Sequence, residues 1–192
     1  MSSSSPQQRR GNTGQRIQDV ALELFAEQGY EKTSLREIAE RLEVTKAALY
    51  YHFKTKEDII ISIFDDVTRP IDELIEWAEQ QPRTLEMKRE VLRRYSEAMA
   101  GGASLYRFMQ ENQATMRELS IGETVKKRLF ALVELLRTED GPLTNQVRCV
   151  SALFTLHAGM MFLQHVEGDP EETRQAALEV ATDLITQAHQ EV

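Results

Sequence analysis

Two short helical segments separated by a turn constrain this chain more than any other feature. Ser34 is followed by Glu37, the pattern of a capping box, in which the serine hydroxyl and the glutamate carboxylate each satisfy a free backbone N–H. This pattern predicts a helix over residues 34–42. After a short turn, Thr45 can cap a second helix over residues 45–53. Two helices of this length, joined so closely, have the form of a helix-turn-helix.

A third helix is predicted before this pair, over residues 13–28. Apolar residues from Ile17 to Phe25 recur at helical spacing, and Gly29 stands where a C-terminal cap belongs. This helix would brace the pair, so that the three share one core. The residues predicted to form that core are Leu24, Phe25, Ile38, Ala39, Leu42, Val44, Leu49 and Phe53.

The second helix of a helix-turn-helix enters the major groove of DNA, so residues 45–53 are the first candidates for contacts. The small side chains of Ala47 and Ala48 permit a close approach, and Lys46 can donate to guanine. Hydroxyls and free N–H groups at a helix start suit phosphate oxygens. The predicted DNA-binding residues are Thr33, Ser34, Arg36, Thr45, Lys46, Ala47, Ala48, Tyr50, Tyr51, His52 and Lys56.

Some of these residues also have a plainer interpretation. Tyr50 can belong half to the core, Arg36 can bind a phosphate and not a base, and His52 can serve in packing. Lys54 and Lys56 would be an ordinary solvated pair in most proteins. The adjoining motif is what favours a phosphate contact for them here.

The net charge of −8 hides an asymmetry. Residues 1–56 hold nine Lys or Arg against seven Asp or Glu, a charge of +2, whereas the remainder holds 14 against 24, a charge of −10. A mildly basic N-terminal part on an acidic remainder favours an anionic partner for the N-terminal part alone. Ordinary scatter of charged residues is the alternative.

The rest of the chain is also helical in pattern, which predicts an all-α fold. A long helix runs from Thr55 to about Ala78 and contains Pro70, which should bend it. Further helices are predicted over residues 84–100, 103–119 (less regular), 121–137, 143–166 and 170–189. The single cysteine, Cys149, cannot form an intrachain disulfide, and the longest near-apolar run is too short to span a bilayer. We therefore expect a soluble cytoplasmic protein.

The stretch GYEKTSLREIAERLEVTKAALYYHFKTKEDII, residues 29–60, resembles the DNA-binding module of the tetracycline-repressor (TetR) family of bacterial transcription regulators. The most specific feature is Leu49-Tyr50-Tyr51-His52-Phe53 followed by Lys56, and the resemblance covers residues 13 to 60. Glu43 departs from the pattern, because the family usually has Gly in this turn. The resemblance implies a homodimer whose two reading helices enter successive major grooves, roughly 34 Å apart, of a pseudo-palindromic operator.

By the same resemblance, the C-terminal helices dimerise and hold a small-molecule effector. The helix 143–166 is apolar nearly all round and carries small residues, so a partner subunit is expected to cover it, together with helix 170–189. Methionine-rich, aromatic walls suit adaptable recognition of apolar ligands, although such residues are also ordinary core. The candidate ligand-binding residues are Tyr95, Met99, Phe108, Met109, Met116, Phe154, His157 and Met161.

The sequence thus predicts a flexible tail over residues 1–12, a helix-turn-helix domain over 13–56 and a ligand-binding and dimerisation domain over 57–192. The predicted function is a ligand-responsive regulator, a repressor released from its operator by a small, largely apolar inducer. A ligand-blind DNA-binding protein is the alternative. No catalytic motif or metal-ligand spacing occurs, so neither an enzyme nor a cofactor is expected.

Overall fold

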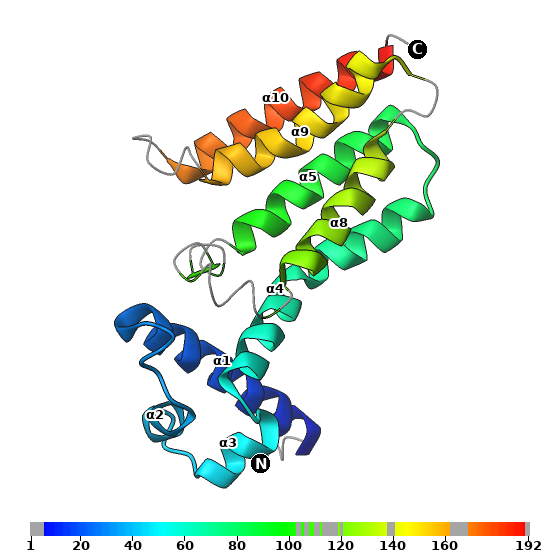
Figure 1. The fold of residues 1–192 in the computed structure, drawn as a ribbon. Helices are drawn as coiled ribbons and strands as arrows, with labels where there is room; N and C mark the ends of the chain where they lie inside the picture. Colours follow the sequence, from blue (N-terminus) through cyan, green and yellow to red (C-terminus); the bar gives the residue numbers. More distant parts are fainter. Residues whose placement is uncertain are drawn as a thin grey trace. The chain divides into compact units, whose positions relative to one another are not determined.

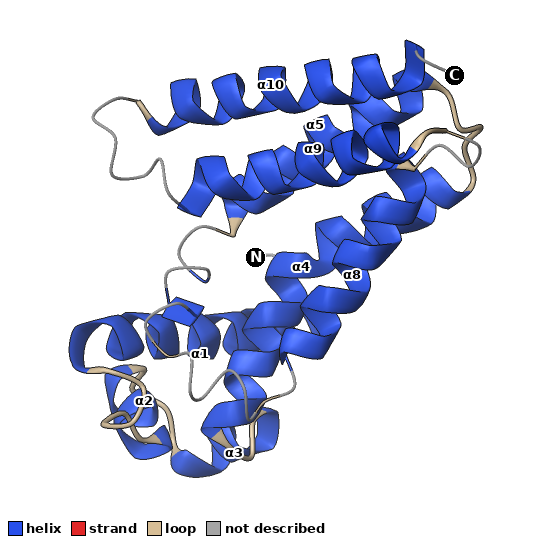
Figure 2. Ribbon diagram, turned by 45° about the horizontal axis from the view of Figure 1, so that its top comes forward, coloured by secondary structure: helices blue, strands red, loops and turns tan. Residues whose placement is uncertain are grey.

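The computed structural model describes residues 6–102, 105, 108, 109, 112, 119, 121–137, 141–161 and 169–190. All regular secondary structure in these residues is helical, which confirms the predicted all-α class (Figures 1 and 2). The helices are α1 (Pro6–Gln28), α2 (Leu35–Arg41), α3 (Lys46–His52), α4 (Lys56–Glu79), α5 (Leu85–Gly101), α8 (Ile121–Leu136), α9 (Leu143–Met161) and α10 (Pro170–Gln190).

Two compact units make up the chain. We call them the head, Met1–Asp66 with Leu105–Ile121, and the body, Val67–Ser104 with Gly122–Val192. The division falls inside α4, beyond residue 56, and it assigns the segment that starts at Leu105 to the head. Compact units need not coincide with functional domains, so the predicted functional boundary after residue 56 remains a prediction.

The helices α1 and α2 end as their sequences predict. Gly29 follows α1 with a φ of 91°, a conformation that glycine adopts without strain. After α2 the N–H groups of Glu43 and Val44 donate to the carbonyls of Glu40 and Ala39, which is a Schellman cap. Glu43 has a φ of 56° there, a strained value for a residue with a side chain.

The start of α1 differs from the prediction. Residues 6–12 were expected to belong to a tail, but the helix begins at Pro6. Proline suits a first helical turn, because its φ is already helical and its missing N–H would have no partner there. The following Gln and Arg residues are good helix formers without an apolar stripe, so hydrophobic periodicity could not reveal them.

The two short helices of the predicted pair carry the predicted caps. The Ser34 hydroxyl accepts from the Glu37 N–H at 3.2 Å, and the Glu37 carboxylate accepts from the Ser34 N–H at 2.8 Å. The Thr45 hydroxyl accepts from the Ala48 N–H at 3.1 Å. These bonds fix where α2 and α3 begin.

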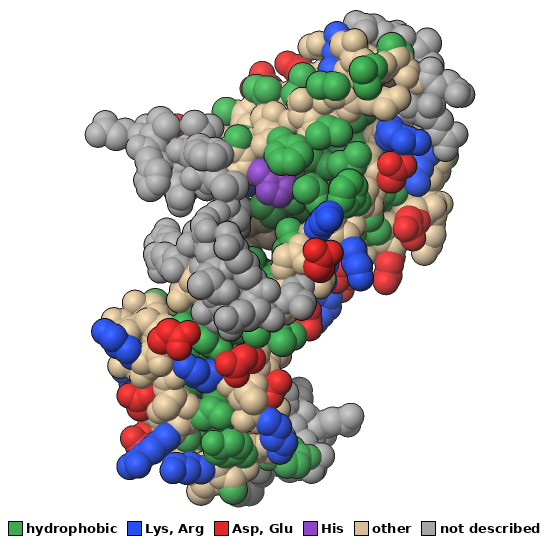
Figure 3. Space-filling view, viewed as in Figure 1, with side chains coloured by type: hydrophobic (Ala, Val, Ile, Leu, Met, Phe, Trp, Pro, Cys, Tyr) green, Lys and Arg blue, Asp and Glu red, His purple; other side chains and the backbone are tan. Residues whose placement is uncertain are grey.

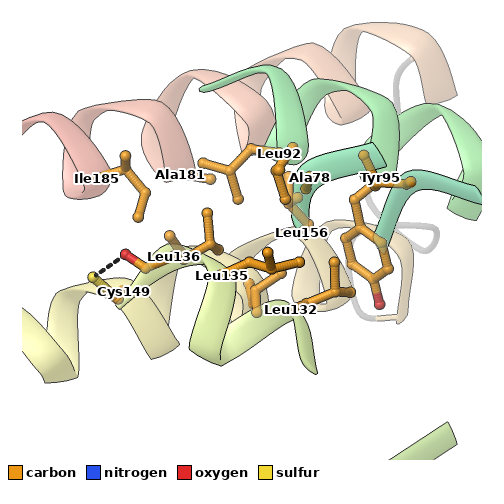
Figure 4. Close-up of a cluster of buried hydrophobic side chains, with 14 of the residues drawn as sticks. Ala78, Leu92, Tyr95, Leu132, Leu135, Leu136, Cys149, Leu156, Ala181 and Ile185 are labelled. Atoms are coloured by element: carbon orange, nitrogen blue, oxygen red, sulfur yellow. Dashed lines mark hydrogen bonds between the residues drawn. The ribbon is translucent and has the colours of Figure 1, made fainter. Parts of the chain in front are cut away.

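The body is built on a core of mainly aliphatic side chains from α4, α5, α8, α9 and α10, with Tyr95 among them. Figure 4 shows how these side chains face one another, with the Cys149 thiol donating to the Leu136 carbonyl at 3.2 Å. The neighbouring helices α9 and α10 lie side by side (Figures 1 and 2). A Cβ atom at Gly159 would lie only 2.8 Å from the Cβ of Ala177, so this glycine permits their close approach.

This packing modifies the interpretation of the small residues of α9. Gly159 and Ala152 were expected to admit a helix of another subunit, but Gly159 faces α10 of its own chain and Ala152 is fully buried. The predicted helices 84–100, 121–137 and 170–189 agree with α5, α8 and α10 to within about one residue. Most of the predicted helix 103–119 and the end of 143–166 lie outside the described residues. None of the described helices is both long and apolar enough to cross a membrane.

Candidate nucleic-acid interface

One side of α3 is anchored in the head and the other is presented to solvent. Leu49 is fully buried, whereas Lys46, Ala47 and Ala48 are exposed. Tyr51 is 65% exposed, so most of its side chain faces solvent. On the face of the head seen in Figure 3, Lys and Arg side chains lie among apolar and acidic ones. The exposed side of α3 therefore carries small, aromatic and basic side chains.

The hydroxyls of Ser34 and Thr45 serve first as helix caps. Both residues are exposed, so each can also face a phosphate at the start of its helix. The hydrogen bond from the Ser34 hydroxyl, followed by that from its N–H, lowers the pKa of Glu37, so this carboxylate stays charged and the capping box stays closed. Tyr50, 45% exposed, lies between core and surface.

Arg36 projects from the first turn of α2 and pairs with the next turn. Its Nε donates to Glu40 Oε1 at 2.6 Å, and this hydrogen bond raises the pKa of the guanidinium. Both side chains are more than 60% exposed. Exposed pairs of this kind contribute little stability, so Arg36 can leave Glu40 for a phosphate or a guanine at low cost.

Thr33 makes its hydrogen bonds within the chain. Its side chain is buried, and its hydroxyl donates to the carbonyl of Gly29 at 2.9 Å while accepting from Gln28 Nε2 at 3.2 Å. Its N–H is also used, in a bond to the carbonyl of Tyr30. The Thr33 hydroxyl is thus engaged by the carbonyl at the end of α1, and its contact with a phosphate stays a prediction.

Lys56 is half-buried and already engaged. Its ammonium donates to the carbonyl of Tyr30 at 2.7 Å and lies 4.3 Å from the centroid of the Tyr30 ring. The Tyr30 hydroxyl in turn donates to Glu57 Oε1 at 3.0 Å. Sequence reasoning named Gly29-Tyr30 only as part of a motif and missed this role of Tyr30, since both partners lie far along the chain.

His52 and Lys54 lie at the end of α3. The His52 ring is half-buried and meets the edge of Tyr51, with centroids 5.4 Å apart. A Cβ atom at Gly14 would lie 3.8 Å from His52 Nδ1, so α1 passes close to this ring. The Lys54 ammonium donates to the Tyr50 carbonyl and so caps the last turn of α3.

Two of the predicted ligand-binding residues meet inside the body. The Tyr95 hydroxyl lies 2.9 Å from His157 Nε2, and His157 Nδ1 lies 2.9 Å from the Leu153 carbonyl. A carbonyl only accepts, so Nδ1 carries the hydrogen, and in the neutral imidazole Nε2 accepts from Tyr95. Burial raises the pKa of the Tyr95 hydroxyl, which therefore stays protonated.

The other predicted ligand-binding residues are dispersed. Phe154 lies near His157, with ring centroids 6.0 Å apart, but is 54% exposed. Met99 packs against the body's core. Phe108 is counted with the head and not with the body, and its ring stacks on Phe25 at 5.6 Å, so its role in ligand binding stays a prediction.

Met109 is half-buried, Met116 lies outside the described residues, and so does the side chain of Met161. Among the described residues, no group of three or more His, Cys, Asp or Glu could hold a metal ion.

Comparison with known proteins agrees with this geometry. The sequence profile of the family described as "Bacterial regulatory proteins, tetR family" matches residues 17–63. The HTH-type transcriptional regulator AcrR of Shigella flexneri is 48% identical over 62 residues, which are 32% of this chain and 29% of that protein. The fatty acid metabolism regulator protein of Bacillus subtilis is 26% identical over 133 residues, 69% of this chain and 66% of that protein.

A solved structure extends the likeness of the fold to nearly the whole chain. The fatty acid degradation regulator FadR from Bacillus halodurans superposes with a TM-score of 0.66 at 19% identity, covering 94% of this chain and 97% of that one. The sequence match to AcrR, by contrast, spans less than a third of that relative's length. Residues 17–63 therefore hold a helix-turn-helix module of the tetR family of bacterial regulatory proteins, the DNA-binding part that this chain shares with transcriptional regulators such as AcrR.

Proposed function

We propose that this chain is a dimeric, ligand-responsive repressor that binds a pseudo-palindromic operator in the cytoplasm. The observation that carries the proposal is the outward presentation of Lys46, Ala47 and Tyr51 on a helix anchored by Leu49. Lys46 donates to guanine acceptors, and the alanine methyl groups contact thymine methyls. Arg36 reads a base or binds a phosphate beside them.

Backbone contacts would fix the register of this helix on the DNA. Ser34 and Thr45 stand at the starts of α2 and α3, where hydroxyls, free N–H groups and the helix dipole suit phosphates, and His52 at the end of α3 would add a ring N–H. The rings of Tyr50 and Tyr51 pack against the backbone or the bases. Lys56 contributes its charge from a fixed position and not as a freely moving side chain.

Exposed apolar residues on α9 and α10 support dimerisation through these helices. Leu143 is 74% exposed, Val147 56% and Phe154 54%, and on α10 Val180 is 51% exposed. The three on α9 are spaced by four and seven residues, so they share one helical face. A second copy meeting this face would form a four-helix interface about a two-fold axis.

The pair Tyr95 and His157 supports an effector site in the body. While His157 accepts the Tyr95 hydrogen, the phenolic oxygen keeps lone pairs, so it suits a ligand that donates a hydrogen bond. On the face seen in Figure 3, a histidine of the body is bordered by apolar side chains. The effector is therefore a largely apolar molecule with a donor group. The name of the Bacillus subtilis relative makes acyl-chain compounds a sensible first panel.

The effector would act by binding more tightly to a dimer whose heads no longer match the groove spacing, because equal affinity for both states shifts nothing. Selection of bound sequences from random duplex DNA, with the purified full-length protein, tests the function. We expect a palindromic consensus, and Lys46→Ala should change the preference at particular positions only. Binding that depends on salt but not on sequence would contradict the proposal.

The effector arm uses the selected operator. A long-chain alcohol or amide should release the protein at lower concentration than the carboxylic acid of the same length, and Tyr95→Phe should remove this preference. If no compound of the panel releases the operator while sequence-specific binding is intact, the ligand-blind regulator is the better description.

A further inference from the structure

Tyr30 is the meeting point of three aromatic rings in the head. It follows Gly29 directly and is 3% exposed. Its ring centroid lies 5.1 Å from that of Phe25 and 6.2 Å from that of Phe108, and the latter two stack at 5.6 Å. Phe108 is 7% exposed and lies outside residues 17–63, the stretch that matches the family. The core of the head therefore includes a residue from beyond the DNA-binding module.

The polar groups of Tyr30 hold the first turn of α4. Its carbonyl accepts from Lys56, its ring lies beneath the same ammonium, and its hydroxyl donates to Glu57. Lys56 and Glu57 are the first two residues of that helix. The hydrogen bond from Tyr30 is one cause of the lowered pKa of Glu57, after that from its own backbone, so the acceptor stays charged near neutral pH.

The first turn of α4 and the end of α3 are held close together by a short connection. Only residues 53–55 connect the two helices. The N–H groups of Lys54 and Thr55 both donate to Asp58 Oδ2, at 3.0 and 2.9 Å, and the Thr55 hydroxyl accepts from the Asp58 N–H. This connection is thus tied to α4 by three bonds. Because this connection is short and held by three hydrogen bonds, a displacement of Tyr30 would also displace α3.

We propose that Phe108 and Tyr30 are positioning residues for DNA binding: packed edge to face, they fix the first turn of α4, and through it the placement of α3 on the operator. This inference rests on the proposed function. It assigns to a residue outside the helix-turn-helix module a share of the operator affinity, although that residue touches no DNA.

The test uses full-length protein and its selected operator. Phe108→Ala removes the stacked ring, and Phe108→Leu keeps most of the volume, in case the alanine variant fails to fold. Phe130→Ala is the matched control, because Phe130 lies on α8 in the body and is 59% exposed. We expect operator affinity to fall about tenfold for Phe108→Ala and about fivefold for Phe108→Leu, and to stay within about twofold for the control.

The salt dependence of binding separates positioning from mere loss of stability. A loosened α3 makes fewer phosphate contacts, so the slope of log affinity against log salt should fall by about one in the Phe108 variants. A smaller folded fraction would leave that slope unchanged. Combined with Lys56→Met, Phe108→Leu should cost less than the sum of the two changes, since both act through Tyr30.

The outcomes are distinct. A wild-type protein without sequence-specific binding contradicts the proposed function itself. A wild-type protein that binds its operator, with Phe108→Leu folded and equal to the control in affinity and in salt slope, overturns the positioning role alone. A reduced slope with non-additive losses supports it.

Discussion

Glu43 has a strained backbone conformation in the helix-turn-helix. It occupies the position of a Schellman cap where glycine is favoured, and its φ of 56° carries a cost that glycine would not have. It also places a negative charge in the turn before α3, close to where phosphates are expected. Conformation and charge can be separated here, because one substitution removes both and another removes only the charge.

We predict that Glu43→Gly stabilises the protein by about 1 kcal/mol, whereas Glu43→Gln leaves stability within about 0.5 kcal/mol, since glutamine keeps the strain. Both variants should bind the operator severalfold more tightly at low salt, and the gain should shrink as salt rises. Denaturant unfolding and binding titrations at two salt concentrations measure the two effects. Equal stabilisation by both variants would mean that charge, not backbone strain, is the cost at this turn.

For Thr33 we expect a substitution to lower stability and to leave operator affinity nearly unchanged. Thr33→Val keeps the shape but leaves the Gly29 carbonyl without the hydroxyl that bonds it at 2.9 Å, so we expect a loss of about 1 kcal/mol in unfolding free energy. Operator affinity, measured well below the melting temperature, should change by less than about twofold. A lower salt slope with unchanged stability would instead support Thr33 as a phosphate contact.

At the scale of helices, the sequence was a good guide wherever both ends of an element carried local signals. α2 and α3 have the side-chain caps predicted at Ser34 and Thr45, whereas the Thr84 cap of α5 was not predicted, although the range of that helix was. The start of α1 lacks an apolar stripe and was missed. Contacts made only in the folded chain could not be predicted from the sequence. The bonds of the Thr33 hydroxyl and of the Lys56 ammonium to backbone carbonyls are of this kind.

For α4 we predict a bend at Pro70 when the effector releases the operator. Pro70 lies inside it and has no N–H to donate toward residue 66, after which the head gives way to the body. We predict that Pro70→Ala stabilises the protein by about 1 kcal/mol or more and makes operator release require more effector. Glu73→Ala, an exposed change one turn away, is the control. If Pro70→Ala is more stable but effector releases it from the operator as readily as the wild type, α4 does not bend at Pro70 during release.

At the scale of the whole molecule, the basic charge and the exposed apolar side chains lie in different parts of the chain. The charge of +2 on residues 1–56 and of −10 on the remainder favours DNA binding by the N-terminal part alone, because a protein that coats DNA without specificity needs a basic surface throughout. The exposed apolar side chains of α9 and α10 belong to the body. Two-fold pairing through α9 and α10 would join two copies of α3 in one dimer.

This division gives a prediction for the assembly. Val147 is 56% exposed in the single chain, on the α9 face with Leu143 and Phe154. Val147→Glu would bury an unpaired carboxylate in the proposed interface, so we expect the dimer to dissociate at least about 100-fold more readily. Phe130→Glu places the same charge on an exposed aromatic of α8 and should leave the dimer intact.

Sedimentation across a range of protein concentrations measures the dissociation, and titration of a full operator against a half-site measures its consequence. The Val147→Glu monomer should lose most of the advantage of the full operator, because two linked heads bind far more tightly than one. Its affinity for a half-site should stay unchanged, since α3 is untouched. A dimer that survives Val147→Glu but not Phe130→Glu would move the interface from α9 and α10 to α8.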